Sequence, residues 1–153
     1  MSTKGKRLIY IGPADGPFEK PLHEEGICTE AALPGAVLDY AGSSAGFELM
    51  DDAATVFGKP LLVADKDQMR SKSVDTAWTA DENMVAIRPR SGDMLNVLVI
   101  TGQALVRGTA LTRSAATPGA LVIAATDGTE EVLCLADEIV TTTTTQLVSV
   151  KVA

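Results

Sequence analysis

The sequence predicts a mainly β protein, a compact β-sandwich or barrel-like domain of short antiparallel strands with an extended N-terminal arm. Short apolar runs recur at the spacing of about 8–12 residues that is typical of sandwiches and barrels, and Pro-Gly, Asp-Gly and single Gly turns separate them. Aromatic residues make up only 4% of the 153 residues, so Val, Leu, Ile and Ala must fill the core. We expect an arm at residues 1–25 and a single β domain at residues 26–153.

Residues 83–111 predict the centre of this scaffold, three strands joined by two tight glycine turns. The run at 95–100 is the most apolar of the protein and is rich in β-branched residues. The whole stretch indicates a β scaffold and no catalytic site. The three strands are expected at residues 84–88, 95–100 and 104–111.

Turns and strands are expected on both sides of this centre. The turn at 33–35 predicts type II geometry, because Pro34 presets φ and Gly35 supplies a positive φ. The turn at 117–119 repeats it, either as part of a weak internal repeat or as one favoured turn used twice, and residues 127–128 predict a hairpin turn. The further strands are expected at residues 7–11, 36–40, 47–50, 60–64, 120–124, 131–136 and 146–152.

Three segments do not follow a simple strand pattern. Residues 51–56 fit one helical turn. Residues 65–76 are polar and mixed in charge, so we expect either a surface loop or a short helix that separates two parts of the fold. The five threonines at 141–145 favour β structure, and the alternating valines of residues 146–152 predict a half-buried closing strand.

The first 25 residues predict an arm without a strand partner inside the domain. Prolines and glycines between residues 12 and 21 exclude a helix and a central strand. A basic cluster precedes them, and its favoured interpretation is a solvated terminal arm, with partner docking and phosphate contact as alternatives. We expect the segment up to about Pro21 to dock on a partner and to be disordered without it. Its candidate docking residues are Lys4, Lys6, Arg7, Pro13, Pro17 and Pro21.

Composition and charge exclude several classes of protein. The formal net charge of −7 argues against nucleic acid as a partner, because phosphate binding needs clustered Lys and Arg. The N-terminus has no signal-peptide pattern, and no apolar run approaches the roughly 20 residues that span a bilayer. We therefore expect synthesis and folding in a cytoplasm and no membrane partner.

Two cysteines and one tryptophan are expected mainly as buried residues. Cys28 and Cys134 lie far apart in apolar surroundings, so buried reduced thiols are the favoured interpretation, and a disulfide between them stays open. Trp78 is the only tryptophan of the chain. It is expected to anchor the core or a loop, with an interface residue as the alternative interpretation.

Residue patterns that would support chemistry are few. His23 is the only histidine, so a catalytic triad or a histidine-based metal site would need it, and an exposed arm is a poor place for preorganised catalysis. The run at 65–67, Asp-Lys-Asp, lacks the Gly and Glu of a calcium loop, so a solvated charge run is favoured. Acidic pairs at 130–131 and 137–138 are typical of any acidic protein. We expect no catalytic residue, no cofactor and no metal.

Several turn and strand segments form one pattern, with Ser-Val-Asp-Thr-Ala-Trp at 73–78, Arg-Pro-Arg-Ser-Gly-Asp at 88–93 and Gly-Thr-Ala-Leu at 108–111. Asn96 and Gly102 lie between them, and the turn at 33–35 and the ending at 131–137 and 147–151 fit as well. This pattern resembles the capsid cement, or head decoration, proteins of tailed bacteriophages over roughly residues 30–153. It departs from that family at Thr109, where an Asp is expected.

The resemblance implies a structural role. Such proteins bind the outside of a mature phage head at the junctions between capsomers, and they hold the shell against internal DNA pressure. The implied partners are the major capsid protein and further copies of the same chain, with a homotrimer favoured and a dimer possible. The alternatives are a binding module of a phage tail or adhesion device and an oligomeric β-fold enzyme.

Overall fold

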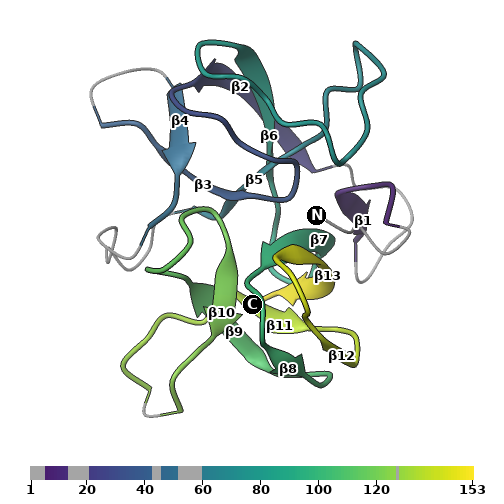
Figure 1. The fold of residues 1–153 in the computed structure, drawn as a ribbon, viewed down its shortest axis with the longest axis vertical. Helices are drawn as coiled ribbons and strands as arrows, with labels where there is room; N and C mark the ends of the chain where they lie inside the picture. The colour runs from purple at the N-terminus through teal and green to yellow at the C-terminus, as the bar shows by residue number, and fades with distance from the viewer. Residues whose placement is uncertain (1–5, 14–20, 43–45, 52–59, 127) are drawn as a thin grey trace.

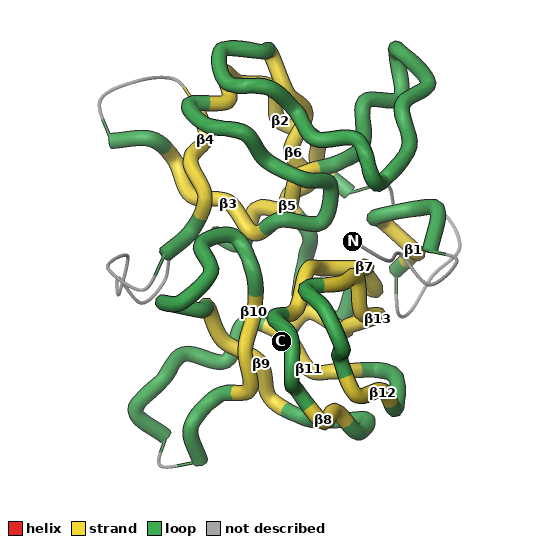
Figure 2. Tube along the Cα trace, in the orientation of Figure 1, coloured by secondary structure: helices red, strands yellow, loops and turns green. Residues whose placement is uncertain are grey.

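The computed structural model describes residues 6–13, 21–42, 46–51, 60–126 and 128–153 (Figure 1). Every regular element in these residues is a β-strand, and no helix occurs among them (Figure 2). This confirms the mainly β fold. Most of the expected helical turn at 51–56 lies outside the described residues. The strands are β1 Tyr10–Gly12, β2 Leu22–Cys28, β3 Val37–Tyr40, β4 Gly46–Leu49, β5 Leu62–Ala64, β6 Asn83–Arg88, β7 Met94–Val99, β8 Ala104–Leu105, β9 Ala110–Arg113, β10 Leu121–Ile123, β11 Cys134–Ala136, β12 Val140–Thr141 and β13 Gln146–Val152.

The strands form two barrels, one above the other in Figure 1. The first barrel is closed in the order β2-β4-β3-β5-β6. In the second sheet, β7, β10, β9, β11 and β13 follow one another, and an additional pairing of β13 with β7 closes this ring as well. The short ribbon of β8 and β12 and the single strand β1 are added to the second barrel.

Both barrels have the same connectivity. With the strands of each lettered a to e in chain order, both rings run a-c-b-d-e. Strands a and c are parallel in each ring, β2 with β4 and β7 with β10, and the other pairs are antiparallel. The repeated turns at 33–35 and 117–119 precede strand b in one barrel and strand c in the other, so they are one favoured turn used twice.

The N-terminal residues differ from the expected arm. β1 pairs with β7, and β2 pairs with β6 from Leu22 to Ile27, so the described residues before 26 belong to the folded body. Ile9 is a fully buried core residue. The expectation of an arm without strand partners is therefore wrong for these residues, because their partner strands lie more than fifty positions later in the chain and leave no local signal.

The order of the later strands also differs in two places from the expected one. The strand expected at 104–111 is divided into β8 and β9 by a turn in which Gly108 has a φ of 87°. The hairpin expected around 127–128 does not form, because β10 pairs with β9 and β7 while β11 pairs with β9 and β13. The closing strand at 146–152 is confirmed as β13, and it borders β7 over six residue pairs.

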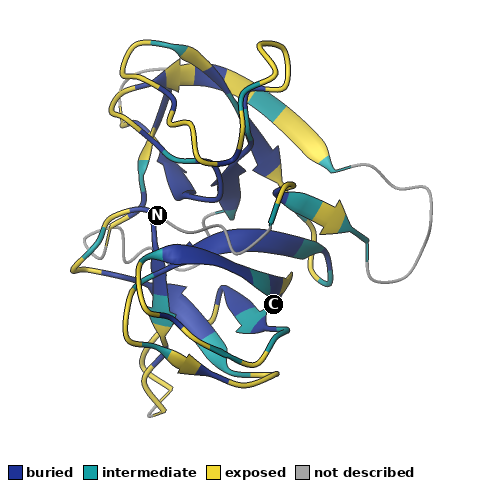
Figure 3. Cartoon of the chain, turned by 45° about the vertical axis from the view of Figure 1, so that its right-hand side comes forward, coloured by how far each residue is buried: buried dark blue, intermediate teal, exposed yellow. Residues whose placement is uncertain are grey.

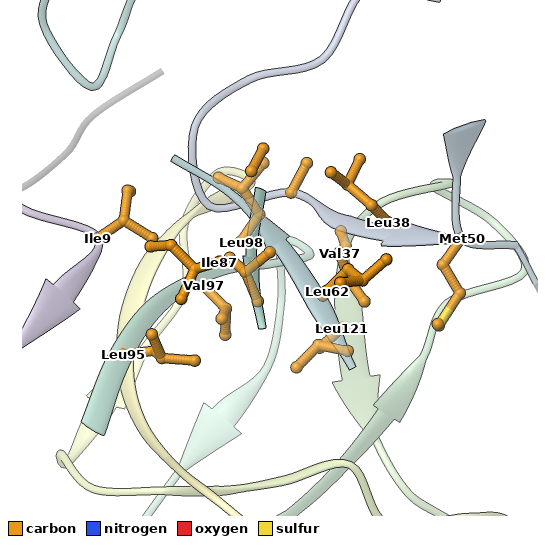
Figure 4. Close-up of a cluster of buried hydrophobic side chains, with 14 of the residues drawn as sticks. Ile9, Val37, Leu38, Met50, Leu62, Ile87, Leu95, Val97, Leu98 and Leu121 are labelled. Carbon is orange, nitrogen blue, oxygen red and sulfur yellow. The ribbon is translucent and has the colours of Figure 1, made fainter. Parts of the chain in front are cut away.

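One hydrophobic core runs through both barrels (Figure 4). Val37 and Leu62 of the first barrel lie in the same cluster as Leu98 and Leu121 of the second. Figure 3 shows that the strands facing the middle of the molecule are largely buried, whereas the loops at its ends are exposed. Aliphatic side chains make up almost all of this core, as the low aromatic content predicts.

Two Pro-Gly turns join the barrels, because each turn forms backbone hydrogen bonds with a strand of the other barrel. The carbonyl of Gly35, before β3, accepts a hydrogen bond of 2.9 Å from the N–H of Leu98 on β7. The carbonyl of Gly119, before β10, accepts one of 2.8 Å from the N–H of Val37 on β3, and the Gly119 N–H donates to Met50 at 2.8 Å. Both glycines have positive φ, 86° and 79°. The exchange gives the two barrels a common backbone network.

We expect Gly35→Ala to destabilise the protein by about 3 kcal/mol, the sum of left-handed backbone strain and overpacking. A Cβ at this position would overlap Leu147 and lie 3.2 Å from the carbonyl oxygen of Asn96. Gly108→Ala is the matched control, because its φ of 87° is nearly the same and no atom lies within 4 Å of the added Cβ. Chemical denaturation should show a loss of about 1 kcal/mol for the control. Equal losses in both variants would contradict the role of the joint.

Candidate functional site

The expected docking residues at the N-terminus have different surroundings. The Lys6 ammonium donates to Ser149 Oγ at 2.6 Å and lies 3.0 Å from Glu138 Oε1, so it is held by the second barrel. Arg7 is exposed. Pro13 and Pro21 are half-buried. The remaining two candidates, Lys4 and Pro17, lie outside the described residues.

A chain of polar contacts fixes the N-terminal segment to the second barrel. Buried Asn96 donates from Nδ2 to the Leu8 carbonyl at 2.7 Å, and its Oδ1 accepts from Ser149 Oγ at 2.9 Å. Ser149 in turn accepts from Lys6. The backbone at Leu8 is therefore rigidly placed, while the side chains of Leu8 and Ile11 are 54% and 48% exposed.

Trp78 is an internal anchor. Its side chain is 4% exposed, and its indole Nε1–H donates to the Asp65 carbonyl at 2.7 Å. Its backbone forms a bridge with Ala32 through two hydrogen bonds of 2.8 and 3.2 Å. The structure thus places Trp78 beneath the loop at 65–76, as the anchor interpretation predicts, and not on the exposed surface. That segment is a loop, as one of the two expectations for it predicts.

A groove of about 570 Å³ lies between this loop and the outer face of the β2–β6 pair. Glu25 on β2 is directly opposite Val85 on β6, and His23 and Asn83 extend the same face. Strand alternation places these odd-numbered residues outside the barrel, while the even-numbered Met84 and Ala86 are fully buried in its interior. The loop at 65–70 and Trp78 form the other wall.

Two buried carboxylates belong to the loop wall of the groove. Asp65 is 5% exposed; its Oδ1 accepts from the Lys66 N–H at 2.8 Å, and its Oδ2 accepts from Gln68 Nε2 at 2.9 Å. His23 Nε2 lies 3.7 Å from the same Oδ2, across the groove. The expectation that residues 65–67 are a solvated charge run is therefore wrong, because both aspartates turn inward to hydrogen-bond their own loop.

Asp67 is the second buried carboxylate, and it is only partly satisfied. It is 6% exposed, and its Oδ1 accepts from the Arg70 N–H at 3.1 Å. Its Oδ2 has no hydrogen-bond partner, although Arg70 Nε and Lys72 Nζ lie 3.6 and 3.7 Å away. This oxygen is therefore enclosed within the loop and held by two ion pairs rather than by hydrogen bonds.

Glu82 holds the base of the loop. Its Oε2 accepts from the Thr79 N–H at 2.8 Å, and its Oε1 accepts from Arg70 Nη1 at 2.7 Å. The backbone hydrogen bond from Thr79, followed by the bond from Arg70, lowers the pKa of Glu82 from 4.5 to about 2. Lys72 lies 3.8 Å from the same carboxylate. These contacts link the loop to the start of β6.

Chemically, the groove offers three carboxylates, an imidazole, two amides and two cationic side chains beside an apolar floor. The described residues that line it include no Ser, Thr, Cys or Tyr. In the described part of the chain, no group of three or more His, Cys, Asp or Glu side chains is placed to hold a metal ion. The arrangement is suited to binding a polar or charged group.

The groove was not predicted from the sequence, because His23 was assigned to the arm and the acidic run at 65–67 to solvent. The available signal was the position of Asp65 and Asp67 directly after β5, since a buried strand that ends in acidic residues delivers them to one edge of a sheet. The strand that carries His23 gave no such signal, because its partner β6 begins more than fifty residues later.

Both cysteines are buried free thiols, which confirms the favoured interpretation and closes the question of a disulfide. Burial raises the pKa of Cys134 to about 12. Burial also raises the pKa of Cys28, whose Sγ lies against the Glu30 carbonyl. Both therefore stay protonated at neutral pH and unreactive as nucleophiles.

A scan of the chain against known protein families found no match, and a search of curated proteins found none either. Among the described residues, no helix is long and apolar enough to cross a membrane. The function is therefore to be argued from the residues and their geometry.

We expect Glu82→Gln to lower the melting temperature at neutral pH and to have no effect near pH 2. A carboxylate with a lowered pKa in the folded state contributes stability above its unfolded value of 4.5 and loses it as the pH falls toward about 2. Thermal melts of both proteins between pH 7 and pH 2 measure this difference. Glu48→Gln, at an exposed position of β4, is the control. A deficit of Glu82→Gln that is the same at pH 2 as at pH 7 would contradict it.

Proposed function

We propose that this protein is a capsid decoration, or cement, protein of a tailed bacteriophage. It binds the outer surface of the mature head at capsomer junctions, with the major capsid protein as its partner, and stabilises the shell against internal DNA pressure. It acts as a homo-oligomer, with a trimer favoured over a dimer, and not as an enzyme. It is made in the cytoplasm of the host bacterium and becomes part of the virion, without nucleic acid or membrane as partners.

The observation that carries this proposal is the exposure of apolar side chains along the N-terminal segment. Leu8, Ile11 and Leu22 are 54%, 48% and 57% exposed, whereas Ile9 between them is buried in the core. Because β1 and the contacts of Asn96 fix this segment, the exposed side chains are presented without the entropic cost of ordering a free arm. Exposed apolar side chains held in place in this way suit docking on a protein surface.

The closed barrels support a mechanical role. Because both rings are closed, the open strand edges among the described residues are limited to β1, the β8–β12 ribbon and the first residues of β2, which restricts edge-to-edge aggregation of a protein present in many copies on a lattice. The glycines at three turns of the pattern that resembles decoration proteins, Gly92, Gly102 and Gly108, all have positive φ, between 80° and 91°. A side chain at these turns would strain the backbone, which gives the pattern a physical reason.

An enzyme on the same scaffold is the second candidate, because three carboxylates line the groove beside His23. In that case His23, 3.7 Å from Asp65 Oδ2, would be the general base. The two candidates differ in what the loss of His23 does. It abolishes an enzymatic reaction and leaves mechanical stabilisation of a shell unchanged.

We expect the double variant Leu8→Ser, Ile11→Ser to bind heads at least about tenfold more weakly than the wild type, because two half-exposed apolar groups lose contacts repeated at every lattice site. Co-sedimentation with expanded heads that lack the protein measures this. The control is Val106→Ser, Ile139→Ser, which changes two side chains that are 58% and 77% exposed at the β8–β12 end. Equal weakening by both pairs would contradict docking through the N-terminal segment.

We expect heads given back wild-type protein or His23→Ala to survive heating or osmotic shock better than undecorated heads. Val97→Asp should give no protection, because Val97 is fully buried and a charge there costs several kcal/mol, a large part of a typical stability of about 5–15 kcal/mol. If undecorated heads survive as well as decorated ones, the decoration role fails. If His23→Ala binds heads without protecting them, His23 has a chemical role.

A further inference from the structure

We propose that the groove between the β2–β6 pair and the loop at 65–70 is a binding site for a single cationic side chain, the guanidinium or ammonium group of Arg or Lys on its aliphatic stem. This site is distinct from the N-terminal docking segment, and the inference does not depend on the decoration role.

The first argument is that the groove contains a carboxylate without a partner. Among the described residues, the Glu25 carboxylate on β2 takes part in no hydrogen bond or ion pair, although it faces the groove. Asp67 adds negative charge behind the loop wall, although its enclosed Oδ2 atom already lies 3.6 and 3.7 Å from Arg70 Nε and Lys72 Nζ. A ligand that brings charged N–H groups to the exposed Glu25 carboxylate would form charge-assisted hydrogen bonds with it.

The second argument is the balance of charge. The lining contains the carboxylates of Glu25, Asp65 and Asp67 and two cations, Lys66 and Arg70. Arg70 is paired with both Glu82, at 2.7 Å, and Asp67, at 3.6 Å, while Lys66 Nζ donates to the Arg7 carbonyl at 3.3 Å, so the carboxylates of the lining outnumber its cations by one. The groove therefore favours a positive ligand over a neutral or negative one.

The third argument is the shape of the apolar surface. Half-buried Val85 forms the floor directly opposite Glu25, Trp78 closes one wall, and Met69 at the loop tip is 94% exposed beside the opening. Arg and Lys have a three- or four-carbon stem that packs on such a surface while the charged head reaches a carboxylate. A small inorganic cation would leave this apolar part of the groove unused.

The side chain of Trp78 allows binding in the groove to be followed spectroscopically. Trp78 is the only tryptophan of the chain, and its indole N–H donates to the carbonyl of Asp65 in the wall of the groove. Its single indole resonance in a ¹⁵N–¹H spectrum, and its fluorescence, will respond to a ligand that enters.

The test is a titration of the full-length protein with N-acetyl-arginine amide and N-acetyl-lysine amide, followed by the Trp78 indole resonance. N-acetyl-citrulline amide, the neutral isostere of the arginine compound, is the ligand control. We expect saturable binding in the range of about 1 mM for the cationic compounds and none for citrulline. Glu25→Gln should weaken binding about fivefold, and Glu48→Gln, which removes the same charge at an exposed site on β4, should leave it unchanged.

Equal shifts with citrulline, equal weakening in both variants, or no saturable shift would overturn the proposal. Agmatine, which has the guanidinium without the amino-acid backbone, distinguishes the source of the ligand. Tighter binding of the blocked amino acids assigns the site to a side chain of a partner protein. Tighter binding of agmatine assigns it to a free small amine.

Discussion

The exchange of backbone hydrogen bonds between two Pro-Gly turns is the constraint on which the arrangement of the molecule depends. Each barrel is small, and a barrel of this size has little core of its own. By placing Gly35 against β7 and Gly119 against β3, the chain brings the outer faces of the two barrels close enough to form one hydrophobic cluster. Only residues without a Cβ permit this approach at positive φ, since Leu147 on one side and Leu49 on the other leave no space.

Much of the local structure could be predicted from the sequence, because strands and turns leave short-range signals. The apolar run now seen as β7, the alternating valines of β13 and the two Pro-Gly turns were all placed correctly. The pairing of these strands into two closed rings could not be predicted. The parallel pairs β2–β4 and β7–β10, the closure of the rings and the absence of a β10–β11 hairpin depend on contacts between distant segments, and a strand pattern does not specify its partner.

The side chains of the N-terminal residues and of the groove could not be placed from the sequence for the same reason. The sequence of β2, with His23, Glu24 and Glu25 in succession, resembles a polar arm until its partner is known. Pairing with β6 buries Gly26 and Cys28 and leaves His23, Glu25 and Ile27 on the outside, where Glu25 meets Val85. The groove is formed by β2, the loop at 65–70 and β6, which lie far apart in the chain. Only the acidic residues that follow β5 indicated it in the sequence.

Lys66 contacts both proposed binding surfaces, the groove and the N-terminal segment. It lines the groove, and its ammonium donates to the carbonyl of Arg7, next to the exposed Leu8 of the N-terminal segment. A bond of 3.3 Å at an exposed position is weak, worth at most about 1 kcal/mol, so a ligand in the groove would change the position of the segment only slightly. The stronger fixation comes from buried Asn96, which lies in the second barrel and does not reach the groove. The two surfaces are thus neighbours that act almost independently, which allows one partner to contact both.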